Sequence, residues 1–165
     1  MSKTDILQKA IAAEKESMKR YLEIARKTES VGGKNMLITL ALDEHEHMEI
    51  LEEQLQAAAE GGGFVPLRIE QSDIERLIPK LDGAFKNSGI KAVHQLSALE
   101  VAMDHEKEAA AYYRQQADRA DDPDVARLFE RLAEMEDAHY LMVQAEVDYI
   151  RKTGFWFDIQ TLDRH

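Results

Sequence analysis

The sequence predicts an all-α protein, a four-helix bundle made of two similar helix hairpins with a long crossover connection between them. Apolar residues recur at helical spacing in four long segments, and clear stop signals separate these segments. The chain also repeats itself at an offset of 92 residues, with eleven identities in register between residues 7–47 and 99–139. We therefore expect a single domain in these 165 residues: a first repeat over about 4–59, a crossover over 60–89, a second repeat over about 90–152 and an aromatic tail over 153–165.

The first hairpin consists of two predicted helices. The first runs from about Thr4 to Lys27 and stops in the segment 28–33. The second follows at once and runs to about Ala59, where Gly61-Gly62-Gly63 ends it. Because a loop of roughly five residues joins them, the two helices are expected to be antiparallel neighbours.

The crossover and the second hairpin follow. We predict a short helix at Ser72–Leu81, broken by Pro79, in a connection long enough to cross the bundle from end to end. The third long helix is expected over about Ile90–Ala120, and the fourth from Asp122-Pro123, a good cap and first-turn pair, to about Lys152. Such a long link is compatible with exchange of a hairpin between two chains, so a homodimer, swapped or not, is one expectation.

Charge and composition exclude several classes of protein. With 21 basic and 32 acidic residues the net charge is -11, which favours cations and disfavours nucleic acids or anionic membranes as partners. The first residues lack the apolar core of a secretory signal, and no run approaches the roughly 18 apolar residues of a spanning helix, so we expect a cytoplasmic protein. Since the chain has no cysteine, any metal ligand within it must be oxygen or nitrogen.

Four glutamates lie on the apolar stripes, one in each long predicted helix, and two of them precede a histidine by three positions. The glutamates are Glu14, Glu44, Glu106 and Glu136, and the histidines are His47 and His139. Residues three apart share a helix face, so each Glu-x-x-His pair points inward. Burying four unpaired carboxylates would cost several kcal/mol each, whereas two divalent cations would balance their charge. The sequence therefore predicts a two-metal site with these six residues as ligands.

A single Glu-x-x-His pair would prove little, because 19 glutamates and 6 histidines give about 0.7 such pairs by chance. Two pairs at the repeat offset, with matched glutamates, favour metal binding. His45 and His105 lie off the inward face and are expected at the surface. Tyr21 and Tyr113 point inward, and packing in the core explains this as well as a functional role does. The functional role would be a hydrogen bond from each hydroxyl to a ligand carboxylate of the opposite half.

These residues resemble those of ferritin-like di-iron carboxylate proteins, and within them the rubrerythrins, in which two helices give a Glu each and two give Glu-x-x-His. The resemblance covers most of residues 4–152 and implies a ferritin-like fold with two iron ions per site, bridged by Glu44 and Glu136 and flanked by Glu14 and Glu106. Manganese and zinc suit the same ligands. The segment Gly154–Asp158 resembles the aromatic end of uncharacterised rubrerythrin-like proteins, for which an apolar plug or a dimer contact is the ordinary explanation.

The resemblance also implies an activity. A rubrerythrin-like oxidoreductase would reduce hydrogen peroxide, or dioxygen, as a defence against oxidative stress. Two departures bear on this expectation: without cysteines the electrons must come from a separate donor such as a rubredoxin-like protein, and Ala109 stands where rubrerythrins have an extra glutamate, with Ser17 as its counterpart. The alternatives are iron oxidation for sequestration, and a non-redox bundle that binds zinc or manganese.

Overall fold

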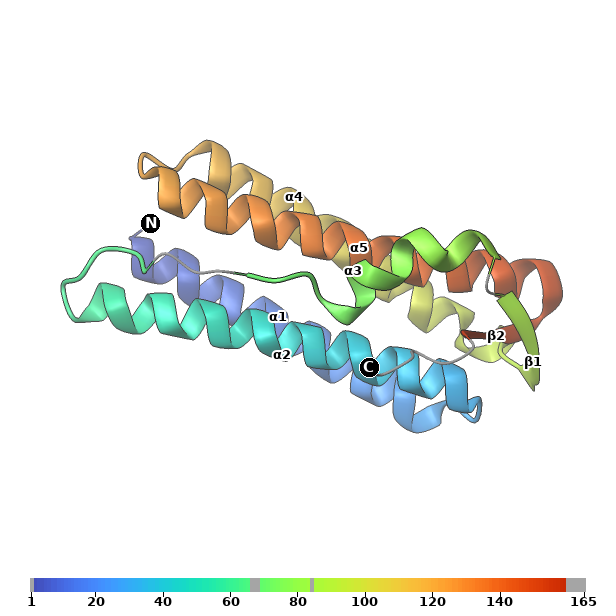
Figure 1. Ribbon diagram of the computed structural model, residues 1–165. Helices are drawn as coiled ribbons and strands as arrows, with labels where there is room; N and C mark the ends of the chain where they lie inside the picture. The colour runs from blue at the N-terminus through green and yellow to red at the C-terminus, as the bar shows by residue number, and fades with distance from the viewer. Residues whose placement is uncertain (1, 66–68, 84, 160–165) are drawn as a thin grey trace.

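Four long helices form the bundle in the computed structural model, which describes residues 2–65, 69–83 and 85–159 (Figure 1). The long helices are α1 (Lys3–Lys27), α2 (Val31–Ala59), α4 (Leu96–Asp118) and α5 (Pro123–Thr153). Packing is most extensive between α1 and α2 and between α4 and α5, so each repeat is an antiparallel hairpin. The predicted ferritin-like helical bundle is confirmed. Among the helices of the described ranges, none is long and apolar enough to cross a membrane.

Local capping residues set most helix ends. The Ser2 side chain accepts a hydrogen bond from the Asp5 N–H, and the Asp5 side chain accepts one in return from the Ser2 N–H, which closes a capping box at the start of α1. As predicted, Asp122 caps α5 and Pro123 occupies its first turn. Gly154 ends α5 in the left-handed conformation, with φ of 80°, where a side chain would be strained.

The crossover lies over the face formed by α2 and α5. Its short helix α3 (Asp73–Leu77) continues as a 3-10 helix, η1 (Ile78–Gly83), in the region where a short helix interrupted by Pro79 was predicted. The contacts of α3 are with α2 and α5, and those of η1 are with α5 (Figure 1). The face between α1 and α4 lies on the opposite side of the bundle.

The predicted start of the third long helix is wrong. Residues Phe85–Lys91 form strand β1, and α4 begins only at Leu96, after a 3-10 turn, η2 (Val93–Gln95). Strand β1 pairs antiparallel with β2 (Phe155–Ile159), with an irregular register between Asn87 and Lys91. The partner strand comes from the far end of the chain, so the pattern around Ile90 could not reveal it. Gln95 also makes no side-chain cap, which leaves no local signal for the helix start.

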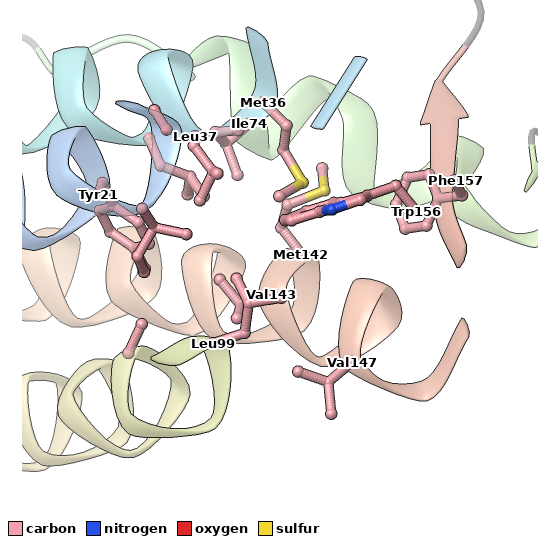
Figure 2. Packing of buried hydrophobic residues seen from close by; sticks show 14 of the residues in the cluster. Tyr21, Met36, Leu37, Ile74, Leu99, Met142, Val143, Val147, Trp156 and Phe157 are labelled. Atoms are coloured by element: carbon pink, nitrogen blue, oxygen red, sulfur yellow. The ribbon is translucent and has the colours of Figure 1, made fainter. Parts of the chain in front are cut away.

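The described part of the aromatic tail plugs one end of the bundle, which is the first of the two explanations considered for it, and residues 160–165 of the tail lie outside the described residues. Trp156 is fully buried, and Figure 2 shows its ring reaching from β2 toward Met36 and Met142. Its indole N–H donates to the Gln95 side chain at 2.9 Å. Gly33 makes room for the ring, since a Cβ at this position would lie 2.6 Å from Trp156 Cε3.

The internal repeat extends beyond the helices into the segments that follow them. The buried amide of Gln54 pairs with both backbone groups of Val65, at 2.8 and 3.0 Å. Ninety-two residues later, the buried Glu146 accepts the backbone N–H of Phe157 at 3.0 Å. In both halves, a buried polar side chain near the end of the second helix holds the backbone eleven residues further on.

Candidate metal centre

The candidate centre lies between two apolar clusters, one toward each end of the bundle. One cluster contains Leu37 and Leu99, and the other contains Leu7, Leu51 and Leu132. Each long helix contributes to both clusters, and the predicted ligands lie on the stretch between the two contributions, except that His139 directly follows Ala138 of the first cluster. The helical period that buries the apolar stripe therefore buries the ligands with it.

The structure brings all six predicted ligand residues together. The side chains of Glu14, Glu44, His47, Glu106, Glu136 and His139 are each at most 2 % exposed. They form two groups of four in which one ligand atom from each residue lies within 4.8 Å of the others. Glu44 and Glu136 belong to both groups, whereas Glu14 belongs to the group of His47 and Glu106 to that of His139. Two overlapping sites with two shared carboxylates suit a pair of metal ions.

The imidazoles direct Nδ1 toward the carboxylates. His47 Nδ1 lies 3.1 Å from Glu14 Oε2, 3.3 Å from Glu44 Oε2 and 2.9 Å from Glu136 Oε1. His139 Nδ1 lies 3.4 Å from Glu44 Oε1 and 3.4 Å from Glu136 Oε2. The two oxygens of each shared carboxylate thus face different histidines. The rings themselves are nearly parallel, with centroids 5.4 Å apart, as expected for groups related by an internal repeat.

Two tyrosines cross-link the halves through the carboxylates. Tyr21 of the first repeat donates to Glu106 of the second, and Tyr113 of the second donates to Glu14 of the first. Both rings are about 1 % exposed. Burial, together with the adjacent carboxylates, raises the pKa of both phenols well above 10. The structure therefore contains the predicted hydrogen bonds from the tyrosines to carboxylates of the opposite half. Each hydroxyl keeps its proton and donates it to a carboxylate.

Electrostatics divide the four carboxyl groups into two pairs. Burial, reinforced by the neighbouring carboxylates, raises the pKa of Glu44 well above its ordinary value and that of Glu136 to about 8. Burial also opposes ionisation of Glu14 and Glu106, but their contacts with the histidines outweigh it. The pKa of Glu14 is lowered as a result, and that of Glu106 falls to about 2.

The histidines respond in the opposite sense to their burial. Burial alone would lower the pKa of each imidazole, but the surrounding carboxylates raise the pKa of His47 and His139 well above 6.5. Without metal, these shifts favour protons on both imidazoles and on Glu44 and Glu136, and ionised carboxylates at Glu14 and Glu106. The charges of two imidazolium groups would then balance those of two carboxylates.

The arrangement of the donor atoms suits a bound metal ion better than it suits hydrogen bonds between these side chains. Both oxygens of Glu44, Glu106 Oε2, Glu136 Oε1 and His139 Nδ1 are buried and make no hydrogen bond among the described residues. Glu136 Oε1 is only 2.9 Å from His47 Nδ1, yet the contact lacks hydrogen-bond geometry. Buried polar atoms normally have partners. Carboxylate and imidazole atoms that converge without them are a suitable donor set for iron, manganese or zinc.

Sequence reasoning missed one buried carboxylate at the centre. Asp43 is 5 % exposed, and its Oδ2 lies 3.2 Å from His139 Nε2, behind the nitrogen that faces the cluster. Such a contact fixes the orientation of a ligand imidazole. The repeat could not reveal it because the counterpart of Asp43 is Met135. His45 and His105 are exposed, as predicted.

Four helices that carry two lone glutamates and two Glu-x-x-His pairs around one buried centre define the ferritin-like carboxylate class of metal proteins. The family model named Rubrerythrin matches residues 5–147, and the chain belongs to this family. Family and cluster together fit a di-iron protein.

Solved structures agree with this fold. A hypothetical protein from Pyrococcus furiosus superposes with a TM-score of 0.69 at 22% identity, and 94% of each chain is covered. An uncharacterised conserved protein from Magnetospirillum magnetotacticum gives a TM-score of 0.57 at 22% identity, covering 93% of this chain and 96% of that one. A search of curated proteins finds no match. At this identity the likeness supports the fold alone.

Proposed function

We propose that this protein is a di-iron oxidoreductase of rubrerythrin type that reduces hydrogen peroxide with electrons from an external donor. The observation that carries the proposal is the pair of overlapping donor groups that share Glu44 and Glu136. Glu14 and His47 would complete one iron position, and Glu106 and His139 the other. The shared carboxylates would bridge the two ions.

Two ferrous ions bound here would supply the two electrons that, with two protons, break the O–O bond of hydrogen peroxide and yield two water molecules, leaving the irons ferric. Two electrons must then return from outside the centre. Because these 165 residues contain no cysteine, we expect a redox group outside them, such as a rubredoxin-like protein, to be the donor.

The remaining residues hold and orient the ligands. Tyr21 and Tyr113 keep a proton directed at Glu106 and Glu14, and so fix the two carboxylates that belong to only one donor group. Asp43 fixes the ring of His139 from behind. The apolar clusters on either side limit the access of water, which strengthens the electrostatic contacts within the centre.

Anaerobic loading with Fe(II), followed by stopped-flow absorbance, tests the proposal. We expect two irons per chain and faster oxidation by hydrogen peroxide than by dioxygen. Faster oxidation by dioxygen with continued iron uptake would instead favour iron handling, and failure to bind two irons would remove the di-iron assignment.

Variants test the bridging role separately. Glu44→Ala and Glu136→Ala should each abolish binding of paired ions, whereas Glu108→Ala, at an exposed position on α4, should leave two ions bound. Retention of two ions per chain by either bridging variant would contradict the bridging role.

A further inference from the structure

The face of the bundle between α1 and α4 carries a pocket of about 390 Å³. We call it the α1–α4 pocket; its lining includes Ala13 and Ser17 from α1 and Ala109, Tyr112 and Tyr113 from α4. Ser17 and Ala109 correspond at the repeat offset, so both helices contribute a small residue from the same position of the repeat. The crossover contacts α2 and α5 and thus lies over the other face.

The pocket reaches the metal centre through one side chain. Tyr113 lines the pocket, is 1 % exposed, and donates its hydroxyl hydrogen to Glu14. Glu14 is a member of one of the two donor groups. A molecule in the pocket is therefore separated from a candidate ligand carboxylate by the ring of Tyr113.

The α2–α5 side also carries a pocket, of about 520 Å³, but most of the residues that line it are acidic, and it meets the centre at Asp43, behind the His139 ring. Both imidazoles come from α2 and α5, and Asp43 occupies the position behind the His139 ring. On the α1–α4 side, the centre presents the carboxylates of Glu14 and Glu106 with their tyrosines. A small molecule that arrives on this side would meet carboxylates and tyrosine hydroxyls rather than the back of an imidazole ring.

The lining suits a small uncharged molecule that forms hydrogen bonds. Alanine and aromatic carbon line much of the space, alongside Glu16, Arg20, His105 and Glu108. The Tyr112 hydroxyl oxygen is buried without a hydrogen-bond partner among the described residues. A phenol hydroxyl that has no partner can donate a hydrogen bond to an oxygen atom of hydrogen peroxide. Burial raises the pKa of Tyr112, which keeps this hydroxyl a donor.

We propose that the α1–α4 pocket is the entry route by which the small neutral oxidant reaches the centre, passing between Ser17 and Ala109 and then past Tyr113. The route rests on the proposed di-iron function, because it leads to those ions. Closing the pocket should slow entry and exit while leaving the ligands in place.

Ala109→Leu and Ser17→Leu fill the pocket from opposite walls, so each tests the route if the other fails to fold. Ala145→Leu is the matched control, since Ala145 lies on α5 in a different surface pocket of about 550 Å³. Nitric oxide is the probe: it is small and neutral, and its binding to the Fe(II)-loaded protein is followed by absorbance. Iron content and circular dichroism confirm that each variant is loaded and folded.

An entry route, unlike a binding site, affects the rates of association and dissociation by the same factor. We expect each filling variant to slow nitric oxide association and dissociation by the same factor, about tenfold, equivalent to about 1.4 kcal/mol in the barrier, with an unchanged Kd. The rate of oxidation by hydrogen peroxide should fall in parallel. Ala145→Leu should keep wild-type rates.

The outcomes distinguish the two proposals. If wild-type protein binds two irons and nitric oxide, but both filling variants keep wild-type rates, the route is overturned and the di-iron function stands. A changed Kd with an unchanged association rate would also overturn the route, because it would show an altered centre. If wild-type protein binds no iron, the function and the route fail together.

Discussion

Loading the centre with metal should release close to four protons per chain at pH 7. The prediction follows from the groups that hold a proton in the metal-free cluster. These are the four with raised pKa, namely Glu44, Glu136, His47 and His139. With Glu14 and Glu106 ionised, two negative carboxylates face two positive imidazolium groups, and the metal-free cluster is neutral.

The loaded cluster is also neutral, but with metal in place of protons. Two divalent ions bring four positive charges, which four carboxylates and two neutral imidazoles balance. Four protons must therefore leave. At Glu136, whose pKa is about 8, roughly nine-tenths of the carboxyl groups hold a proton at pH 7, so this site releases nearly one.

Isothermal titration calorimetry of Zn(II) binding, in buffers of different ionisation enthalpy, counts the released protons without redox chemistry. The release should fall as the pH rises from 7 through 8, because Glu136 then loses its proton before metal binds. The control Glu108→Gln changes an exposed glutamate on α4 and should leave the release at pH 7 close to four. Release of one proton or fewer from the wild type would refute the reasoning, because it would show that the metal-free carboxyls and imidazoles are already deprotonated.

Three further predictions concern stability. Metal-free protein should lose thermal stability between pH 6 and 8, whereas metal-loaded protein should not. Glu136 has a pKa of about 8 in the folded protein against 4.5 in the unfolded chain, so the folded protein keeps a proton that the unfolded chain has lost. The free energy of unfolding therefore falls by about 1.4 kcal/mol per pH unit for each such proton. Gly33→Ala should cost about 1–3 kcal/mol in urea denaturation despite better helix propensity, because its Cβ would lie 2.6 Å from Trp156 Cε3, while Gly63→Ala, with open space around it, should be nearly neutral. Tyr113→Phe should destabilise metal-free protein by about 1.5–3 kcal/mol, as it removes a buried hydrogen bond to ionised Glu14; equal midpoints in urea would contradict that account.

The internal repeat allowed the clustered residues to be predicted. A ligand that is buried on a helix must lie on the apolar stripe, and a repeat that conserves its position in both halves marks it twice. Glu14 and Glu106 would be ordinary glutamates if each were considered alone. The same logic paired Tyr21 and Tyr113, whose hydrogen bonds cross from one half to the other.

What depends on contacts between distant segments could not be predicted. Strand β1 exists because residues near the C-terminus pair with it, and the segment around Ile90 carries no sign of that partner. Gly33 resembles a poor helix residue until Trp156 is placed against it. Likewise, Gln54 and Glu146 differ in type, so their shared role in holding the backbone eleven residues onward emerges only from the structure.

The two halves of the centre are not chemically equivalent, although a repeat supplies their ligands. Asp43, on α2, lies behind His139 of the opposite hairpin, whereas the corresponding Met135 can offer no carboxylate to His47. Accordingly, His47 Nε2 is buried without a hydrogen-bond partner among the described residues. A carboxylate behind an imidazole fixes its tautomer and makes it a stronger ligand. The position at His139 is therefore the more tightly defined of the two, and this asymmetry arises from a position at which the two copies of the repeat have diverged.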